Sequence, residues 1–327
     1  ILPVLTHVGI EADDLSRKDT CPSCLQEDGI RFLGSAIATL LSVTLSTLFG
    51  DAALDPREKK SLVFTDSVQD AAHRAGFVEA RSHTLTFRAM LRDAIGAGPC
   101  TLDELVERVF QRAGSDPFSR YRMVPPDCID RDEFDAWWKP NSSVGRKSQA
   151  RARVKRRLMF DTTLEFGLQS SFGRTLERTG SVAVQVEAGS PVRLASLART
   201  ALDLEGLQDT LDAPLAATPE ADLVAWVRGV LEHMRQKGGI AHEWLAKYIA
   251  SDGRRFFIWG GRPRTQGMPA FPSGRAAPAY PRVGGATMRE PLLDSVTSPQ
   301  SWYANWTAKT LRVSPKHGAV LAKALLE

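Results

Sequence analysis

The chain has 327 residues, which is enough for two or three domains, and its 43% hydrophobic and 24% charged residues are typical of an ordinary globular protein. A net charge of +4 excludes a strongly basic protein, so any nucleic-acid-binding surface must come from local clusters of cations. Four cysteines in a chain of this size do not indicate a disulfide scaffold and favour a reducing compartment, so we expect a cytoplasmic protein.

Residues 1–34 predict an irregular segment with one Cys-x-x-Cys pair, formed by Cys21 and Cys24. This pair is half of a zinc ribbon or knuckle, because a structural zinc site takes four ligands. Zinc is therefore a candidate cofactor, and free structural cysteines are the alternative. Other ligands would lie upstream or within the chain, where the candidates are His7, Cys100 and Cys128. The chain begins at an isoleucine without an initiator methionine, and we expect it to be part of a longer protein.

Residues 35–100 predict alternating helices and strands, an α/β pattern. The helix expected over 35–49 is the most apolar run of the chain. It is too short and too often interrupted by serine and threonine to span a bilayer, which takes about 20 apolar residues. We therefore expect no membrane partner. A linker, a buried strand over 61–64 and one or two helices ending at Gly96 follow.

The strand over 61–64 runs directly into Thr65, Asp66 and Ser67. Ser67 and Asp70 fit a capping box, so a helix is expected to begin at Ser67. The first turn of a helix exposes unpaired N–H groups and a partial positive charge, which can hold a phosphate. Ordinary capping at a strand–helix turn is the alternative.

The stretch LVFTDSVQDAAHRAGF (62–77) resembles motif IV of superfamily-two DEAD/DEAH-box helicases, at the start of their second RecA-like domain. It is most similar to the branch that includes YprA/MrfA-like repair helicases and anti-phage defence helicases, which often carry cysteine-bound zinc. Shorter segments that are similar to the same branch are CPSC (21–24), EFG (165–167), GRTLE (173–177) and GMPAFP (267–272).

This resemblance implies a partial RecA-like domain over 35–100 and a role in gripping nucleic acid. Carried over to this sequence, the strand tip Thr65-Asp66-Ser67 would face the nucleic-acid strand, and Gln69 and Arg74 would lie nearby on the following helix. The chain has no Gly-Lys phosphate loop, no Mg²⁺ motif and no arginine-rich motif VI. ATP and Mg²⁺ would therefore bind only in the full-length parent, and the chain by itself is expected not to hydrolyse ATP.

The remaining sequence predicts a mainly helical α+β region. An insertion over 101–219 begins with a helix capped by Thr101 and Glu104 and contains an alternating strand over 181–186. Residues 220–301 have the order of a winged helix-turn-helix unit: a helix to Arg235, a turn, a helix over 242–249 and a strand over 254–259. A helical segment over 302–327 closes the chain.

Two tracts of this region concentrate cations. Residues 146–157 hold seven lysines and arginines and no acid, including Arg153 and Arg156; a solvated linker or helix face is the alternative. Residues 253–289 hold seven arginines and no acid, interleaved with aromatic residues, a composition that suits single strands through phosphate pairing and base stacking. A proline-rich loop packed on a core is the alternative there. The candidate contacts in this second tract are Arg254, Arg255, Arg262 and Arg264.

The sequence therefore predicts the nucleic-acid-binding portion of an ATP-dependent DNA helicase or translocase. Its expected partners are single-stranded or forked DNA, the remainder of the helicase chain, and repair or defence proteins. A protein-interaction scaffold and a stand-alone winged-helix regulator are the alternatives. The helix over 242–249 carries Lys247 as its one basic residue besides His242, fewer donors than a recognition helix normally has, which argues against the regulator.

Overall fold

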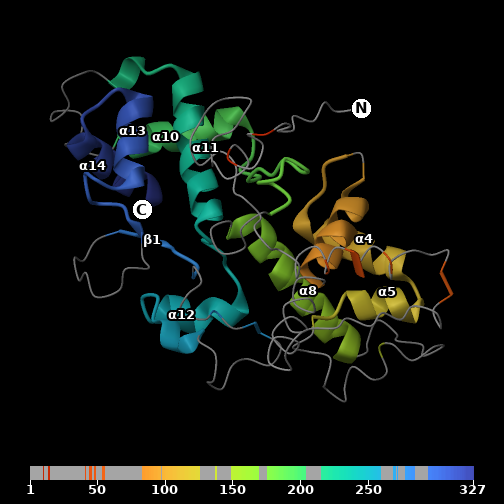
Figure 1. Ribbon diagram of the computed structural model, residues 1–327. Coiled ribbons are helices and arrows are strands. Elements are labelled where there is room, and N and C mark those ends of the chain that lie inside the picture. Colours follow the sequence, from red (N-terminus) through yellow and green to blue (C-terminus); the bar gives the residue numbers. More distant parts are fainter. Residues whose placement is uncertain are drawn as a thin grey trace. The chain divides into compact units, whose positions relative to one another are not determined.

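The computed structural model describes eight segments and several isolated positions of the chain (Figure 1). The segments are 83–96, 98–125, 149–168, 175–203, 215–258, 268–269, 277–283 and 294–327, with residue 271; the isolated positions are 10, 14, 41, 44–45, 48, 54–55 and 137. The chain divides into two compact units, 1–86 and 87–327. The strand over 61–64 and motif IV lie outside the described residues.

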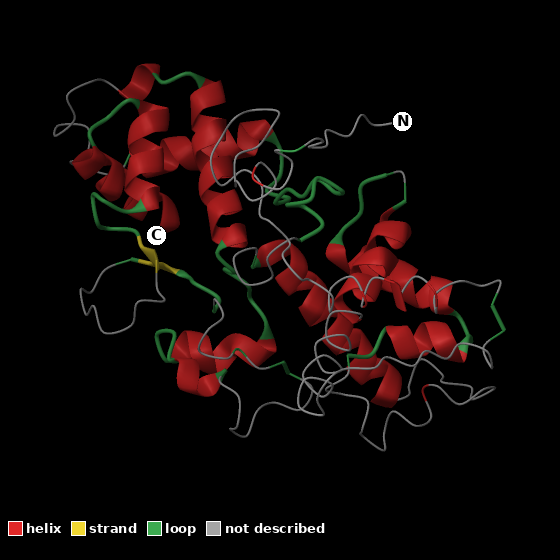
Figure 2. Cartoon of the chain, viewed as in Figure 1, coloured by secondary structure: helices red, strands yellow, loops and turns green. Residues whose placement is uncertain are grey.

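The described part of the second unit is mainly helical (Figure 2). Residues 83–95 are helical, and the helix ends at Gly96, as the sequence predicts. The longer helices that follow are α4 (Leu102–Ala113), α5 (Pro117–Arg122), α8 (Gln149–Gly167), α10 (Pro191–Leu202), α11 (Glu220–Gln236), α12 (Ala246–Ala250), α13 (Trp302–Leu311) and α14 (Pro315–Leu326). Short 3-10 turns are η3 (Leu215–Ala217), η4 (Glu243–Leu245) and η5 (Arg255–Phe257), and the strands β1 (Pro281–Arg282) and β2 (Asp294–Ser295) pair in parallel. No helix in these segments combines the length and apolarity that crossing a bilayer requires.

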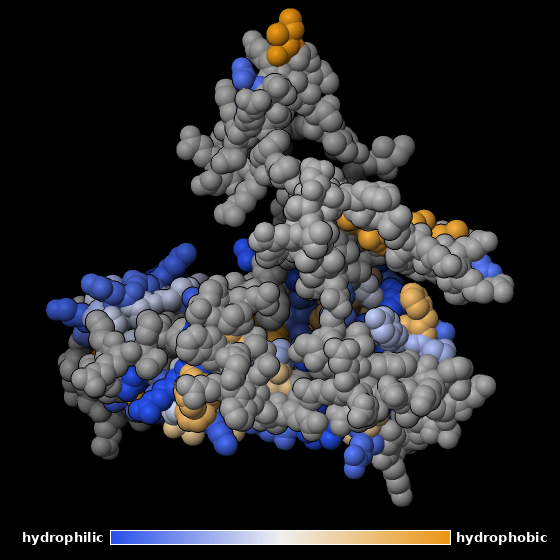
Figure 3. Space-filling model, turned by 60° about the horizontal axis from the view of Figure 1, so that its bottom comes forward, coloured by the Kyte–Doolittle hydropathy of each residue, from blue (hydrophilic) through white to orange (hydrophobic). Residues whose placement is uncertain are grey.

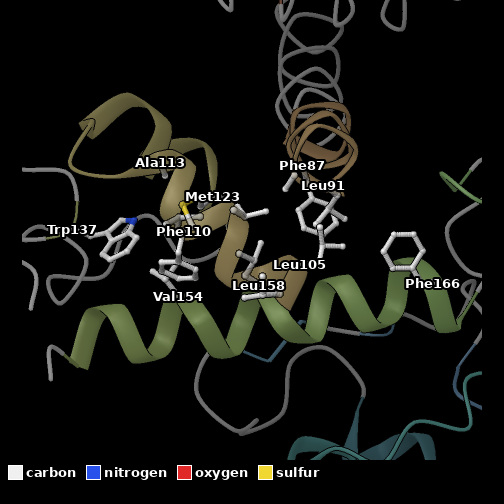
Figure 4. Packing of buried hydrophobic residues seen from close by; sticks show 14 of the residues in the cluster. Phe87, Leu91, Leu105, Phe110, Ala113, Met123, Trp137, Val154, Leu158 and Phe166 are labelled. Carbon is white, nitrogen blue, oxygen red and sulfur yellow. The ribbon is translucent and has the colours of Figure 1, made fainter. Parts of the chain in front are cut away.

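Helix α4 begins where the sequence predicts. The Thr101 side chain accepts a hydrogen bond from the Glu104 amide at 3.3 Å, and the Glu104 carboxylate accepts one from the Thr101 amide at 2.9 Å. This capping box satisfies two backbone donors that a helix start leaves unpaired. The buried face of α4 packs against α8 and residues 87–95 in a first hydrophobic cluster, where Val154 and Leu158 of α8 point toward Leu105 and Phe110 (Figure 4).

Helix α8 contributes to two hydrophobic clusters. Val154 and Leu158 belong to the first cluster, whereas Phe160, Leu164 and Leu168 pack with residues 240–258 in a second one. A helix that is covered on two sides cannot have one polar face and one apolar face. This explains why no single apolar stripe marks residues 149–167 as a helix in the sequence.

A third cluster is built from α10, α11, α13 and α14. Trp226 of α11 is fully buried in it, and its indole N–H donates to the Thr307 hydroxyl at 2.8 Å. The helices approach closely at two glycines: Gly229 lies against the Trp306 ring, and Gly318 lies against the backbone of α13 at Ala304. The predicted helical segment over 302–327 is confirmed as two helices, separated at Arg312, which is left-handed (φ 58°).

The predictions of strands over 254–259 and 181–186 are wrong for the residues that the structure describes. Residues 255–257 form the 3-10 turn η5 instead of the start of a strand. Asp252 and Gly253 both have positive φ, and this turn leaves Phe256 and Phe257 exposed while only Ile258 is buried, so the segment has no ladder to join. The segment over 181–186 keeps the alternating burial of a strand but pairs with no other strand in the described residues. The predicted helix over 242–249 is divided into η4 and α12.

Candidate nucleic-acid interface

Residues 240–258, which we call the platform, pack against the C-terminal half of α8 through the second cluster. Trp244, Leu245, Tyr248 and Ile258 are buried there. Two tyrosine hydroxyls connect residues 277–283 to the platform. Tyr248 donates to the Pro278 carbonyl and Tyr280 donates to the Ile240 carbonyl, each at 2.7 Å. Burial raises the pKa of Tyr280 well above its usual range, so the phenol stays a donor at all ordinary pH values.

The outer end of the platform presents arginines beside exposed aromatic rings. After the turn at Asp252 and Gly253, Arg254 is exposed, and Phe256 and Phe257 are 48% and 37% exposed. The two rings lie 5.4 Å apart at 81°. Guanidinium groups can pair with phosphates and exposed rings can stack on bases, so this arrangement suits an unpaired nucleic-acid strand.

Helix α8 adds Arg156 to the platform. Its guanidinium lies 3.0 Å from the Glu243 carboxylate, and the two side chains are 49% and 60% exposed. An ion pair this exposed contributes little to stability and exchanges readily with other partners. The structure thus places one candidate residue of the first basic tract on the same platform that carries two candidates of the second, Arg254 and Arg255.

Arg146 and Lys147 of the first basic tract lie outside the described residues, and its other described cations lie on α8. Lys155 and Arg151 both contact the Glu107 carboxylate of α4, and the Arg151 guanidinium also lies over the Phe110 ring, 4.9 Å from its centre. Arg157 is buried and pairs with Asp161 at 2.8 Å, and Arg153 is half-buried. The described part of this tract, residues 149–157, is therefore a packed helix in which Arg151, Lys155, Arg156 and Arg157 lie beside acids.

A second polar group of residues, the junction, connects α8 and α11. The buried Glu165 carboxylate accepts from the Arg88 guanidinium at 2.9 Å and from the Leu176 amide at 2.8 Å. Arg235 of α11 binds both Glu177 carboxylate oxygens, at 2.8 and 2.7 Å, as well as Glu232 and the Phe166 carbonyl. Burial lowers the pKa of Arg235, but its hydrogen bonds with Glu177 and Glu232 outweigh that effect and raise it. The guanidinium therefore stays charged.

The junction brings together two sequence segments that are similar to the helicase branch, residues 165–167 and 175–177 of the described part. It also includes Arg88, Glu232 and Arg235, which sequence reasoning missed. These residues lie up to 77 positions from their partners, so no local pattern could have indicated them. Met268 and Phe271, from a third such segment, are buried in the second cluster.

The remaining predicted site residues lie outside the described residues. These are Thr65, Asp66, Ser67, Gln69, Arg74, Arg262 and Arg264, with the zinc candidates Cys21, Cys24, His7 and Cys128. Cys100 is described; it is half-buried and packs against the first cluster. Within the described residues no three potential metal ligands of the His, Cys, Asp and Glu type converge.

Exposed hydrophobic residues are distributed over several elements of the described part. On the face shown in Figure 3 they form separate patches among hydrophilic residues. Large exposed examples outside the platform are Phe118 and Tyr121 on α5 and Val192 and Leu197 on α10.

No known protein family, curated protein or solved structure matches the chain. Its function must therefore be inferred from its own residues.

His242 makes the stability of the platform depend on pH. Its ring packs against Phe160 and Trp244, and its Nδ1 accepts the Trp244 amide at 3.1 Å. Burial lowers the pKa of His242 below its ordinary value of 6.5, Glu243 opposes this shift and Arg156 adds to it. The unfolded chain thus binds a proton more readily, so the stabilisation is complete above about pH 6.5 and decreases as pH falls toward the folded pKa.

We expect the unfolding free energy of His242→Asn to fall less than that of the parent chain below about pH 6.5. Asparagine can keep the cap hydrogen bond to the Trp244 amide but has no proton to bind. Urea unfolding at a series of pH values measures the difference. Parallel pH profiles for the two chains would contradict this role of His242.

Proposed function

We propose that the chain is the nucleic-acid-binding portion of an ATP-dependent DNA helicase or translocase. The sequence support is the resemblance of residues 62–77 to helicase motif IV. The structural observation that carries the proposal is the outer end of the platform, where exposed Phe256 and Phe257 stand beside Arg254 and Arg255. Cations and exposed rings in one short loop fit sequence-independent contact with a single strand.

In this proposal the chain guides the nucleic-acid strand and catalyses no reaction by itself. The sugar-phosphate backbone would be contacted by Thr65, Asp66, Ser67, Gln69 and Arg74 together with the platform arginines. Positive charge would be added by Arg153, Arg262 and Arg264. ATP and Mg²⁺ would bind elsewhere in the full-length parent. The stand-alone winged-helix regulator is less well supported, because the start of its expected wing is a 3-10 turn and its second helix is divided.

Phe256→Ala and Phe257→Ala are each expected to weaken binding of a fluorescent oligothymidine by about 1–3 kcal/mol, the usual contribution of one stacked base. Fluorescence anisotropy at low salt measures the affinity. Phe118→Ala is the matched control, since Phe118 is a similarly exposed phenylalanine on α5, with the Arg122 guanidinium 5.7 Å from its ring centre. It should leave the affinity unchanged.

Salt dependence and sequence preference separate the proposal from its alternatives. Oligonucleotides of any sequence should bind, with affinity that decreases steeply between low and physiological salt. A regulator would prefer one duplex sequence, and a scaffold would bind none of the oligonucleotides. Loss of binding in Phe118→Ala with unchanged binding in Phe256→Ala would move the interface to α5 and overturn the role of the platform.

We also propose that Cys21 and Cys24 bind zinc, because their spacing is that of a zinc ribbon and the resembled helicases often carry one. The purified chain should contain zinc by elemental analysis, and Cys24→Ser should lose it. A chain purified without chelators that contains no zinc would contradict this proposal, which is independent of nucleic-acid binding by the platform.

A further inference from the structure

Residues 181–188 form an extended segment that follows the junction. Burial alternates along it: Val182, Val184 and Val186 are half-buried, and the residues between them are exposed. Val182 and Val184 pack against the first hydrophobic cluster, and Ala188 packs against the third. Such alternation is typical of a strand with one covered face. Figure 2 nevertheless shows this segment as a loop, because it has no strand beside it.

The backbone of this segment is almost unpaired. In the described part of the structure, the amides and carbonyls of residues 182–187 make one hydrogen bond, from the Val186 amide to the Glu232 carboxylate of α11 at 2.6 Å. Successive residues of an extended chain direct their amides and carbonyls to opposite edges. Val182 and Val184 therefore share the α11 edge with Val186, and the opposite edge carries the amides and carbonyls of Ala183, Gln185 and Glu187.

An unpaired strand edge is a template for another strand. We propose that the edge formed by Ala183, Gln185 and Glu187 binds an extended peptide by β-strand addition, in which main-chain hydrogen bonds give affinity and alternate side chains give specificity. This interaction surface is separate from the platform and does not depend on nucleic-acid binding.

The chemistry of the segment defines the peptide. On the covered face, its side chains would continue the row of half-buried valines, so they should be aliphatic. On the exposed face they would lie beside Ser181, Ala183, Gln185 and Glu187, and a lysine or arginine should face Glu187 because opposite charges across strands attract. A second copy of this segment fits less well: antiparallel self-pairing around Val184 places Ser181 opposite Glu187 and supplies no cation.

The probe is an acetylated and amidated hexapeptide of alternating valine and lysine, titrated calorimetrically into the full chain. We expect saturable binding at one site. In a control peptide, the amides that would pair with the 183–187 edge carry N-methyl groups, so it keeps every side chain but lacks those hydrogen-bond donors. It should bind at least about tenfold more weakly. A valine–glutamate hexapeptide should also bind more weakly, since its carboxylates would face Glu187.

Gln185→Pro and Gln185→Ala form a matched pair of variants. Proline removes the Gln185 amide from the open edge while remaining compatible with extended backbone, and alanine keeps that amide. Gln185→Pro should lose about tenfold in affinity for the valine–lysine peptide, and Gln185→Ala should retain it. If Gln185→Pro does not fold, the N-methylated peptide decides the question.

Hydrogen exchange identifies which molecule covers the edge. In the free chain, the amides of Ala183, Gln185 and Glu187 should exchange quickly, and the valine–lysine peptide should protect them. Protection in the free monomer would mean that the edge is covered by its own chain. Protection that increases with chain concentration would mean a second copy. Either result, or equal binding of the N-methylated peptide, would overturn the proposal.

Discussion

Gly318→Ala is expected to lower the unfolding free energy by about 2–3 kcal/mol, as overpacking of a close contact does. A Cβ at position 318 would lie 2.3 Å from the Ala304 carbonyl oxygen and 3.0 Å from the Ala308 amide nitrogen. Both atoms are backbone of α13, so no side-chain rotation relieves the clash and the two helices must separate. Alanine gains about 1 kcal/mol of helix propensity over glycine, which offsets only part of this cost.

Gly98→Ala is the matched control for Gly318→Ala. A Cβ at Gly98 meets no atom within 4 Å, and the unfolding free energy should change by less than about 0.5 kcal/mol. Denaturant unfolding followed by circular dichroism measures both variants. An unchanged midpoint for Gly318→Ala would mean that α13 and α14 do not approach as closely as the structure indicates.

Arg235→Met is expected to cost about 3 kcal/mol of unfolding free energy. The Arg235 side chain is 12% exposed and pairs with both Glu177 and Glu232, so its removal takes away a cation that the two carboxylates share. Methionine has a similar length, which limits any loss of packing. The loss should therefore reflect the two lost ion pairs, and Glu177→Gln should recover part of it in the double variant.

The exposed pair of Arg92 and Asp93 provides the comparison for the junction. Their side chains are 61% and 57% exposed, so Arg92→Met should change stability by less than about 0.5 kcal/mol. Urea unfolding of the single and double variants gives the coupling energy of Arg235 with Glu177. A coupling energy near zero would show that the junction does not contribute to stability.

A local pattern in the sequence predicted the start of α4 correctly, because the capping box of Thr101 and Glu104 lies within four residues. Of the apolar residues that repeat at helical spacing in α11, Leu223, Val227 and Val230 are buried, and Leu231 and Met234 are half-buried. These features depend on backbone donors and on the helical repeat, which a short stretch of sequence contains in full.

Features that depend on distant residues could not be predicted in the same way. The basic tract looked solvated because its principal partners, Glu107 and Glu243, lie 48 and 87 positions away from Lys155 and Arg156. The strand expected over 254–259 had a suitable composition, but a strand requires a neighbour, and among the described residues Ile258 accepts a single backbone hydrogen bond, from the Phe271 amide. The corner at Thr65, Asp66 and Ser67 and the Cys-x-x-Cys pair lie outside the described residues, so the proposals for them rest on the sequence.

The double burial of α8 has a consequence for how this region unfolds. Its side chains complete one core through Val154 and Leu158 and another through Phe160 and Leu164. Unfolding of either cluster would expose apolar side chains of α8 to water. Neither cluster can therefore unfold at low free-energy cost while the other stays folded. The region from α4 to the platform should therefore behave as one cooperative foldon, and a ligand held at Phe256 would slow amide exchange as far away as α4.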